Sequence, residues 1–254
     1  MTVPAVAAHF PLRLVSARMI APAVRHMAFE RADGEPFAFI PGQFIQVHFN
    51  YADGKPTKRS YSVATIGIGD ATPIGQIEIA VSYVEGGAAT ELLSKLEIGA
   101  TVDASGPYGR FCLMEADTNS RYLLVATGTG VTPYRAMLPL IARLTRTRGC
   151  TFELIYGARN EGDLLYGEEF AAFAEATPGF RFHPCFSREP RTQPRPGDTQ
   201  GRVQVAIEAL KPDVAGDIVY LCGNPDMVDQ SFSLLKEIGL PVPHIRREKY
   251  ISSR

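Results

Sequence analysis

Hydrophobic and polar residues alternate in two different ways along this chain of 254 residues. Up to about residue 117, short alternating or β-branched runs are separated by turn residues such as the Asp-Gly pairs at Asp33 and Asp53. The clearest runs are FIQVHF, SYSVATI and QIEIAVSYV, at residues 44–49, 60–66 and 76–84. This pattern predicts an antiparallel sandwich or small barrel. A leucine stripe in ATELLSKLEI predicts one helix over residues 89–98, with Thr90 placed to cap it.

From about residue 121 the pattern changes to strands alternating with helices. The segments, in chain order, are YLLVAT, PYRAMLPLIARL, TFELIYGA, LYGEEFAAFAEA, FRFHPCF, VQVAIEAL, DIVYLCG and PDMVDQSFSLLKEIG. Such alternation predicts a parallel sheet covered by helices on both faces. The polar stretch EADTNS, residues 115–120, lies between the two patterns and is interpreted as a linker. We therefore predict two domains, residues 1–117 and residues 118–254.

Composition and charge narrow the class of protein. Hydrophobic residues make up 45% of the chain and charged residues 21%, as in globular domains. The formal net charge of -1 gives no reason to expect nucleic acid or an anionic membrane as a partner. The chain has no run of about 18 apolar residues for a membrane span, and the N-terminal segment lacks the basic start of a signal peptide. Four scattered cysteines without a CxxC grouping indicate a reduced, cytoplasmic protein without bound metal.

The segment ATGTGVTPYRAM, residues 126–137, follows an apolar strand and opens a helix, which is the setting of a phosphate-binding turn. Gly128 and Gly130 allow a ligand to approach the backbone, and Pro133 suits a first helical turn. A dinucleotide fingerprint of the GxGxxG type needs glycine at position 133, so an ordinary dehydrogenase is not indicated. The residues alone leave open a simple glycine turn between strand and helix.

Four further motifs have a chemical and a structural interpretation. KRSYSVAT places Arg59 and Tyr61 on one strand face and Ser62 on the other, which suits a nucleotide cofactor but also a solvated strand. VEGGAATELL puts glycines and Thr90 at a helix start, which suits an anion-binding site but also a simple helix cap.

GPYGRF is a rigid turn with two glycines, and its structural interpretation is a hairpin. YLCGNPDMV places Cys222 at the carboxyl end of a strand, either facing a ligand or buried in the core.

Taken in order, RSYS, GGAAT, GPYGRF, GTGVTP, YGAR, SRE and CGNPDMV resemble the ferredoxin–NADP reductase superfamily over nearly the whole chain. The sequence is most similar to the compact bacterial ferredoxin or flavodoxin NADP reductases, because SRE is followed by GRV and the chain closes with REKYISSR. The resemblance implies an antiparallel Greek-key β-barrel that holds FAD, followed by an α/β domain that binds NADP(H).

The resemblance also implies roles for individual residues. Arg59 is expected to hold the FAD pyrophosphate, Tyr61 to stack on the isoalloxazine, and Ser62 to bond near its reactive nitrogen. Cys222 is expected to approach the nicotinamide and Tyr250 to cover the other flavin face. The other residues implied in FAD binding are Ser60, Val81, Ser82, Tyr83, Gly87, Ala88, Ala89 and Thr90. Those implied to contact the pyridine nucleotide are Thr129, Gly130, Thr132, Pro133 and Gly223.

The choice between NADP and NAD depends on the 2′-phosphate, a dianion that needs cationic partners. The positions matching those that bind it in the resembling enzymes are Arg159, Ser187, Arg188 and Arg202. NADH-using members often place an acidic residue there, and Glu189 is the candidate for it. We therefore expect NADPH. Arg191 and Arg195, in the same loop, are interpreted as solvated and are not assigned.

The implied function is hydride transfer from NADPH to FAD and delivery of single electrons to ferredoxin or flavodoxin by a monomeric enzyme. The sequence leaves open an NADH-dependent reductase component of an oxygenase system, since GPYGRF is more typical of those reductases. It also leaves open a flavin-binding electron-transfer subunit, although the C-terminal cysteine cluster of such subunits is missing, and a catalytically silent nucleotide-binding module. The acceptor is expected to dock on basic residues, for which the candidates are Arg13, Arg18, Arg25 and Lys58.

Overall fold

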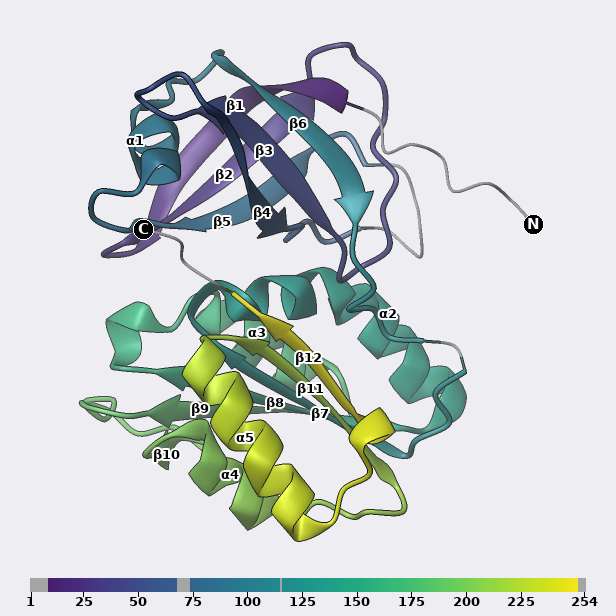
Figure 1. The fold of residues 1–254 in the computed structure, drawn as a ribbon. Helices are drawn as coiled ribbons and strands as arrows, with labels where there is room; N and C mark the ends of the chain where they lie inside the picture. The colour runs from purple at the N-terminus through teal and green to yellow at the C-terminus, as the bar shows by residue number, and fades with distance from the viewer. Residues whose placement is uncertain (1–8, 68–73, 115, 251–254) are drawn as a thin grey trace. The chain divides into compact units, whose positions relative to one another are not determined.

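The computed structural model describes residues 9–67, 74–114 and 116–250, which form two compact units (Figure 1). The first unit contains the described part of residues 1–112 together with Thr132–Met137, and the second contains that of residues 113–131 and 138–251. The predicted domain limits at residues 117 and 118 stay a prediction. Part of the N-terminal segment considered above as a signal peptide, and the tail after Tyr250, lie outside the described residues. Within the described ranges no helix combines the length and the apolar character that a membrane crossing requires.

The first unit is an antiparallel β-barrel of six strands in the order β4-β3-β6-β1-β2-β5. Strand β6 returns between β1 and β3, so the connections follow a Greek key. The edges meet where Ala64 N, just after β4, donates to Glu78 O of β5 at 2.7 Å. The predicted fold class of this half is confirmed. Its elements are β1 His9–Ala21, β2 Val24–Arg31, β3 Phe44–Asn50, β4 Pro56–Ser62, β5 Ile77–Ser82, α1 Ala88–Lys95 and β6 Thr101–Tyr108.

Alternation along the strands builds the barrel core. The inward residues of adjacent strands are fully buried and apolar, as the period of two requires. They include Leu12, Leu14, Met27, Phe29, Ile45, Val47, Ile77 and Ile79.

Three local expectations in this unit were wrong. Residues 106–108 of GPYGRF are the end of β6 and form no hairpin turn, because this segment pairs with β3. Thr90 lies inside α1, which begins after Gly87. That helix ends at Lys95, three residues earlier than predicted, because the backbone is extended at Leu96. The Arg25 guanidinium also donates hydrogen bonds to carbonyl groups at this end, including Leu93 O at 2.9 Å. A cation there also suits the helix dipole.

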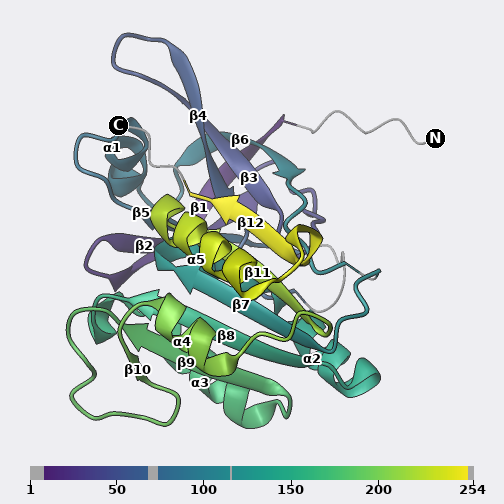
Figure 2. The ribbon, with the colours of Figure 1, turned by 60° about the horizontal axis from the view of Figure 1, so that its bottom comes forward.

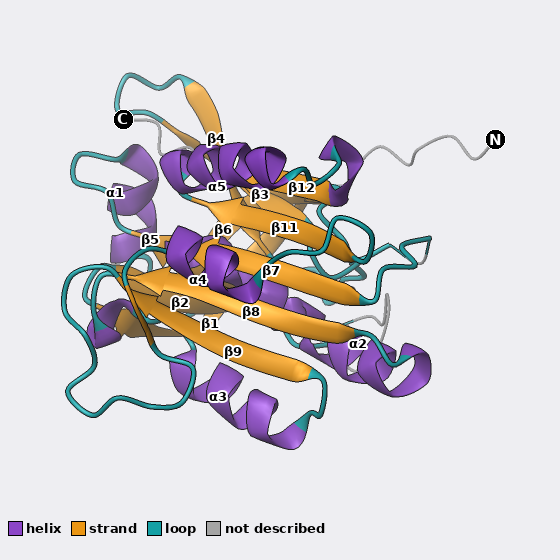
Figure 3. Cartoon of the chain, turned by 90° about the horizontal axis from the view of Figure 1, so that it is seen from below, coloured by secondary structure: helices purple, strands orange, loops and turns teal. Residues whose placement is uncertain are grey.

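The second unit is a parallel sheet in the order β10-β9-β8-β7-β11-β12, as predicted for an α/β half. Helices α4 and α5 cover one face, and α3 and the later part of α2 lie on the other (Figures 2 and 3). Its strands are β7 Arg121–Thr127, β8 Thr151–Ala158, β9 Phe180–Phe186, β10 Thr199–Gln200, β11 Asp217–Gly223 and β12 Ile245–Lys249. Its helices are α2 Thr132–Arg148, α3 Gly167–Ala176, α4 Val203–Leu210 and α5 Pro225–Ile238, with short 3₁₀ turns η1 Gly128–Val131, η2 Glu161–Asp163 and η3 Val242–His244.

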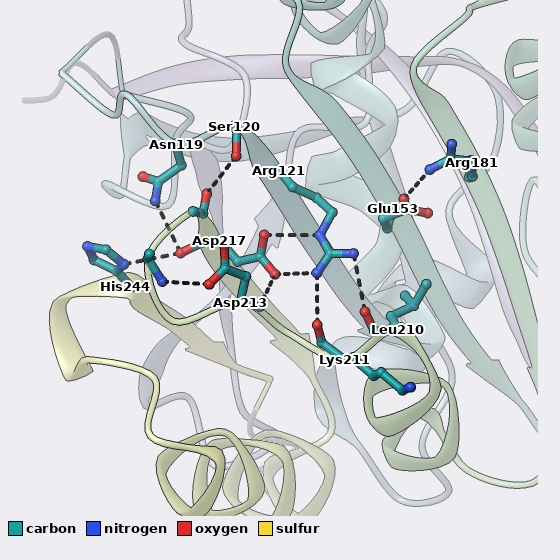
Figure 4. A network of polar contacts seen from close by, with 12 residues as sticks. Asn119, Ser120, Arg121, Glu153, Arg181, Leu210, Lys211, Asp213, Asp217 and His244 are labelled. Atoms are coloured by element: carbon teal, nitrogen blue, oxygen red, sulfur yellow. Dashed lines mark hydrogen bonds and ion pairs between the residues drawn. The ribbon is translucent and has the colours of Figure 1, made fainter.

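A polar network joins the amino ends of β7 and β11 (Figure 4). Arg121 Nη2 lies 2.5 Å from the Asp217 carboxylate, and the same guanidinium donates to the carbonyls of Leu210 and Lys211 at the end of α4. His244 Nδ1 lies 3.1 Å from Asp217 O. Ligands of parallel sheets bind at the opposite, carboxyl ends of the strands, so this network is structural.

The segment predicted as a linker is built into the second unit. Asp117 is buried, with Oδ2 accepting from the Tyr220 hydroxyl at 2.9 Å and Oδ1 from Arg246 at 2.6 Å. The carbonyl of Asp117 accepts from Tyr122 and Arg148. The polar residue Asp117 in this segment forms a buried ion pair and hydrogen bonds. Composition alone does not distinguish such a segment from a solvent-exposed linker.

Candidate functional site

Strand β4 carries Arg59 with its charge uncompensated. The guanidinium donates to Thr57 Oγ1 at 3.3 Å, to Lys58 O at 2.9 Å and to the Tyr51 hydroxyl at 3.2 Å, all neutral acceptors. No carboxylate of the described residues pairs with it. A guanidinium held in place but lacking an anionic partner fits a pyrophosphate.

Tyr61 and Ser62 follow on the same strand. The Tyr61 ring packs against the barrel core, and burial raises the pKa of its hydroxyl to about 12, so the side chain is neutral at physiological pH. Ser62 is buried, whereas Ser60 is exposed. An aromatic ring and a hydroxyl held on one strand end suit a planar heterocycle such as a flavin.

The start of α1 offers amide groups to an anion. Gly87 is the N-cap and no side chain caps this end, while Ala88 and Ala89 begin the helix. Thr90 Oγ1 accepts from Val84 N at 2.9 Å, which folds the preceding loop over the first turn. In β5 and just after it, Val81 is buried, Ser82 is exposed and Tyr83 packs on the core. The uncapped amides fit the phosphate of a nucleotide cofactor.

In the second unit, the carboxyl ends of β7 and β11 are in backbone contact. A Cβ at Gly130 would lie 2.3 Å from Cys222 O, and one at Gly223 would lie 2.5 Å from Thr127 O. Gly223 also has a φ of +129°. Only glycine allows these turns to approach so closely. The structure therefore brings Gly130, Cys222 and Gly223 together from two motifs about 90 residues apart in the chain, a contact that the sequence did not predict.

Tyr250 joins this cluster from the end of β12. Its amide donates to Gly223 O at 2.8 Å, and its side chain is hydrogen-bonded to the Cys222 thiol. Complete burial and the nearby Glu248 raise the pKa of that thiol, so it is held as a neutral S–H group. Glu248 pairs in register with Cys222, and sequence analysis missed it because β12 was not predicted as a strand.

Thr132 and Pro133 form the first turn of α2, as the proline predicted, and Thr132 is buried. One turn on, Arg135 donates to Ala64 O at 2.7 Å and to the Glu78 carboxylate at 2.5 Å, and both partners lie in the same unit. This buried pair, which the sequence did not predict because its partners are 57 residues apart, holds the backbone just beyond Ser62.

Four residues proposed for a 2′-phosphate lie at the carboxyl ends of β8 and β9 and at the start of α4. Ser187 Oγ donates to Ala158 O at 3.2 Å, and Arg188 N donates to Arg159 O at 3.0 Å. Arg159 is forked onto Asp163 at 2.5 and 3.0 Å, while the exposed Arg188 side chain has no carboxylate partner among the described residues. Arg202 is the N-cap residue of α4. Thr129, assigned to the nucleotide, lies in η1 between β7 and α2.

Arg191, interpreted from the sequence as solvated, is buried, with a side chain only 5% exposed. Its guanidinium lies over the Phe186 ring, 5.4 Å from the ring centroid, between Glu161 and Asp198. Arg195 is largely solvated as expected, although it pairs with Glu168. Charge runs in a sequence do not show which arginine faces inward.

Comparison with known proteins agrees with this arrangement. The oxidoreductase FAD-binding domain family matches residues 11–112 and the oxidoreductase NAD-binding domain family matches residues 124–231. Ferredoxin–NADP reductase B of Sorangium cellulosum is 37% identical over 95% of this chain and 97% of its own length. This chain belongs to the ferredoxin–NADP reductase superfamily.

Other members of the superfamily differ in chain length and in the enzyme system to which they belong. The reductase component of propane 2-monooxygenase from Rhodococcus jostii is 31% identical over 85% of this chain, which spans only 56% of that protein. Among solved structures, the cytochrome P450 reductase of Amycolatopsis is 30% identical, with a TM-score of 0.80 over 96% of this chain and 70% of its own. A Neisseria gonorrhoeae ferredoxin NADP⁺ reductase with bound FAD and NADP shares the fold at 22% identity, with a TM-score of 0.78 over 95% of this chain and 98% of its own.

As a superfamily member, the protein is an oxidoreductase that uses FAD and a pyridine nucleotide to pass electrons to a carrier.

Proposed function

We propose that this oxidoreductase takes electrons from NADPH and delivers them singly to a ferredoxin or flavodoxin. The observation that carries the choice of NADPH is the cluster of Arg159, Ser187 and Arg188 at adjacent strand ends, with an exposed, carboxylate-free guanidinium on Arg188. A phosphate dianion is the ligand that such a cluster binds best.

FAD, when bound, supplies the change between two-electron and one-electron chemistry. We assign its pyrophosphate to Arg59 and to the amides of residues 88–90, because the Gly87 amide already donates to Val84 O at 3.0 Å, and we assign its ring to Tyr61 and Ser62. Because the Tyr61 pKa is raised to about 12, the ring contacts the flavin as a neutral aromatic group that holds a hydrogen on its oxygen.

On the pyridine-nucleotide side, we assign Gly130, Cys222 and Gly223 to the nicotinamide. Two of these three residues are glycine, and the space that a Cβ would take at each is filled by backbone of the other turn, so the two turns are fixed against each other. The Cys222 thiol, kept protonated and hydrogen-bonded to Tyr250, would lie beside the bound ring without competing as a nucleophile. These groups position the donor, and positioning is the main contribution that a protein makes to hydride transfer.

A second candidate is an NADH-dependent reductase component of an oxygenase. It is favoured by the similarity to oxygenase reductase components and by exposed Glu189 beside Arg188. The carboxylate would bond to the ribose hydroxyls that NADH leaves free. Monomeric state and cytoplasmic location stay predictions.

Replacement of Arg188 by alanine tests the choice between the two nucleotides. Loss of one charged hydrogen bond to the 2′-phosphate, worth about 1.5–3 kcal/mol, is expected to raise the KM for NADPH by a factor of about 10 to 150. The KM for NADH should stay within about twofold. The rates are measured with an artificial electron acceptor.

The matched control is Arg195→Ala in the same loop, which should leave both KM values unchanged. An equal rise with both nucleotides in Arg188→Ala, or a wild-type enzyme that prefers NADH, would refute the assignment. Purified protein without bound flavin would contradict the function as a whole.

A further inference from the structure

Two loops carry the proposed 2′-phosphate residues, and a single buried cation lies between them. The first loop follows β8 and contains Arg159 and the turn η2, and the second follows β9 and runs through Ser187 and Arg188 to β10. Resting on the NADPH function proposed above, we propose that Arg191 is the positioning residue that holds these loops together and thereby sets the preference for NADPH over NADH.

Backbone hydrogen bonds already align the start of the second loop with the end of β8. Ser187 N donates to Ala158 O, and both Arg188 N and Glu189 N donate to Arg159 O, each at 3.0 Å. The position of Arg159 therefore decides where the Arg188 side chain begins. Whatever holds the first loop also places the second.

Arg191 links the remainder of the two loops through charge. Its Nε lies 3.4 Å from Glu161 Oε1 on η2 and 3.4 Å from Asp198 Oδ2 near β10. Nε and Nη1 make no hydrogen bond within the described part of the chain, so the guanidinium acts as a buried cation between two carboxylates. The Asp198 side chain is 10% exposed and that of Glu161 is 49% exposed, so the pair with Asp198 is the stronger of the two, because buried charges are screened less than exposed ones.

The partners of Arg191 lead directly to the proposed phosphate ligands. Glu161 belongs to the same short turn as Asp163, whose carboxylate fixes the Arg159 guanidinium at 2.5 and 3.0 Å. Asp198, 10% exposed, accepts from Arg195 N at 2.8 Å and so closes the far end of the second loop. Without Arg191, Asp198 would be a buried carboxylate lacking its cation, and the loop would open to hydrate it.

Arg191 itself is not placed as a phosphate ligand. The Arg159 side chain, although forked onto Asp163, is 57% exposed, whereas that of Arg191 is only 5% exposed and lies between Glu161 and Asp198. Its effect must therefore reach the nucleotide through the positions of Arg159 and Arg188.

The test is calorimetric binding of 2′-phospho-AMP and of AMP to the flavin-loaded protein. Arg191→Met is expected to weaken 2′-phospho-AMP by about tenfold or more and AMP by less than about twofold, because AMP lacks the phosphate that the two arginines hold. Arg191→Lys, which keeps the charge but not the fork, should lie between Met and wild type. The control Arg195→Met, on an exposed arginine of the same loop, should match wild type.

A second measurement separates a local from a global effect. In Arg191→Met, hydrogen exchange of the Arg188 and Glu189 amides should accelerate while that of the β7 and β11 amides stays protected. An unchanged ratio of the two affinities in a folded Arg191→Met, or equal weakening of both probes, overturns the inference and leaves the proposed function standing. A wild-type protein that binds 2′-phospho-AMP no better than AMP overturns the NADPH proposal and, with it, this inference.

Discussion

At the scale of single residues, the site depends on where side chains are missing as much as on where they are present. Gly130 and Gly223 allow two turns to meet backbone to backbone, which a Cβ at either position would prevent. Cys222 lies in this contact, and its thiol is hydrogen-bonded to Tyr250. Burial and the nearby Glu248 raise the pKa of that thiol. Small residues thus determine how closely the two turns pack, and the Cys222 thiol is held in its neutral, less reactive form.

Gly130→Ala should displace the turn after β7. Its new Cβ would lie 2.3 Å from the carbonyl oxygen of Cys222, so backbone must move. We expect a loss of about 1–3 kcal/mol in the free energy of unfolding, and a raised KM for both nucleotides in steady-state assays.

The matched control is Gly149→Ala at the C-cap of α2, away from the predicted nucleotide residues. A Cβ there has no neighbour within 4 Å, although its φ of +66° makes alanine cost about 1–2 kcal/mol. The KM values should then stay near wild type. Equal KM changes in the two variants would contradict the steric argument.

At the scale of elements, the two ends of the parallel sheet have separate tasks. The carboxyl ends of β7, β8, β9 and β11 carry the predicted nucleotide residues, and the amino ends of β7 and β11 carry the network around Arg121 and Asp217 (Figure 4). This network also includes the carbonyls at the end of α4, so it fixes strands whose opposite ends carry the predicted nucleotide residues.

Arg121→Met should destabilise the second unit strongly. The Asp217 side chain is only 2% exposed, so removal of its cation leaves a buried charge, at a cost of about 3–5 kcal/mol. The double variant with Asp217→Asn should recover part of this loss, because no unpaired charge remains. The measurement is urea unfolding.

Arg13→Met serves as the comparison, because its pair with Glu30 is exposed on both sides and is worth about 0–1 kcal/mol. A loss in Arg121→Met no greater than that of Arg13→Met would show that the network contributes little.

At the scale of the whole molecule, stability should depend on pH near neutrality. Burial lowers the pKa of both His26 and His48 below 6.5, and it outweighs the opposing effect of the nearby carboxylates Glu78 and Asp103. The unfolded chain therefore binds these protons more readily than the folded one. Well above pH 6.5 both states are neutral at these sites, and as the pH falls through 6.5 the unfolded state gains protons first, so stability decreases across this range.

Chemical unfolding between pH 8 and pH 5 checks this expectation. His26→Gln and His48→Gln should each flatten the dependence in that window. Carboxylates with lowered pKa values, such as Glu153, take up protons in the unfolded state around their usual value of 4.5, so their contribution is confined to the acid end of this range. A slope that survives in the double variant would refute the assignment to these histidines.

Much of the architecture could be predicted from local patterns. Period-two runs such as residues 44–49 became barrel strands, and continuous apolar runs such as YLLVA became a strand buried on both faces. Predictions failed where distant partners decide the outcome. The first part of GPYGRF pairs with β3. Helix α1 ends where Arg25 of β2 donates hydrogen bonds to its carbonyl groups. Asp117 is buried because it pairs with Tyr220 and Arg246.

The sequence by itself determined the order of elements, the change from antiparallel to parallel sheet and the family to which the motifs belong, because these depend on local periodicity and on short motifs. Only the tertiary structure decided that Arg191 is buried while Arg188 is exposed, that Glu248 lies beside Cys222, and that Gly130 meets Cys222. The physical reason is that burial and ion pairing depend on contacts between residues far apart in the chain, which no local pattern encodes.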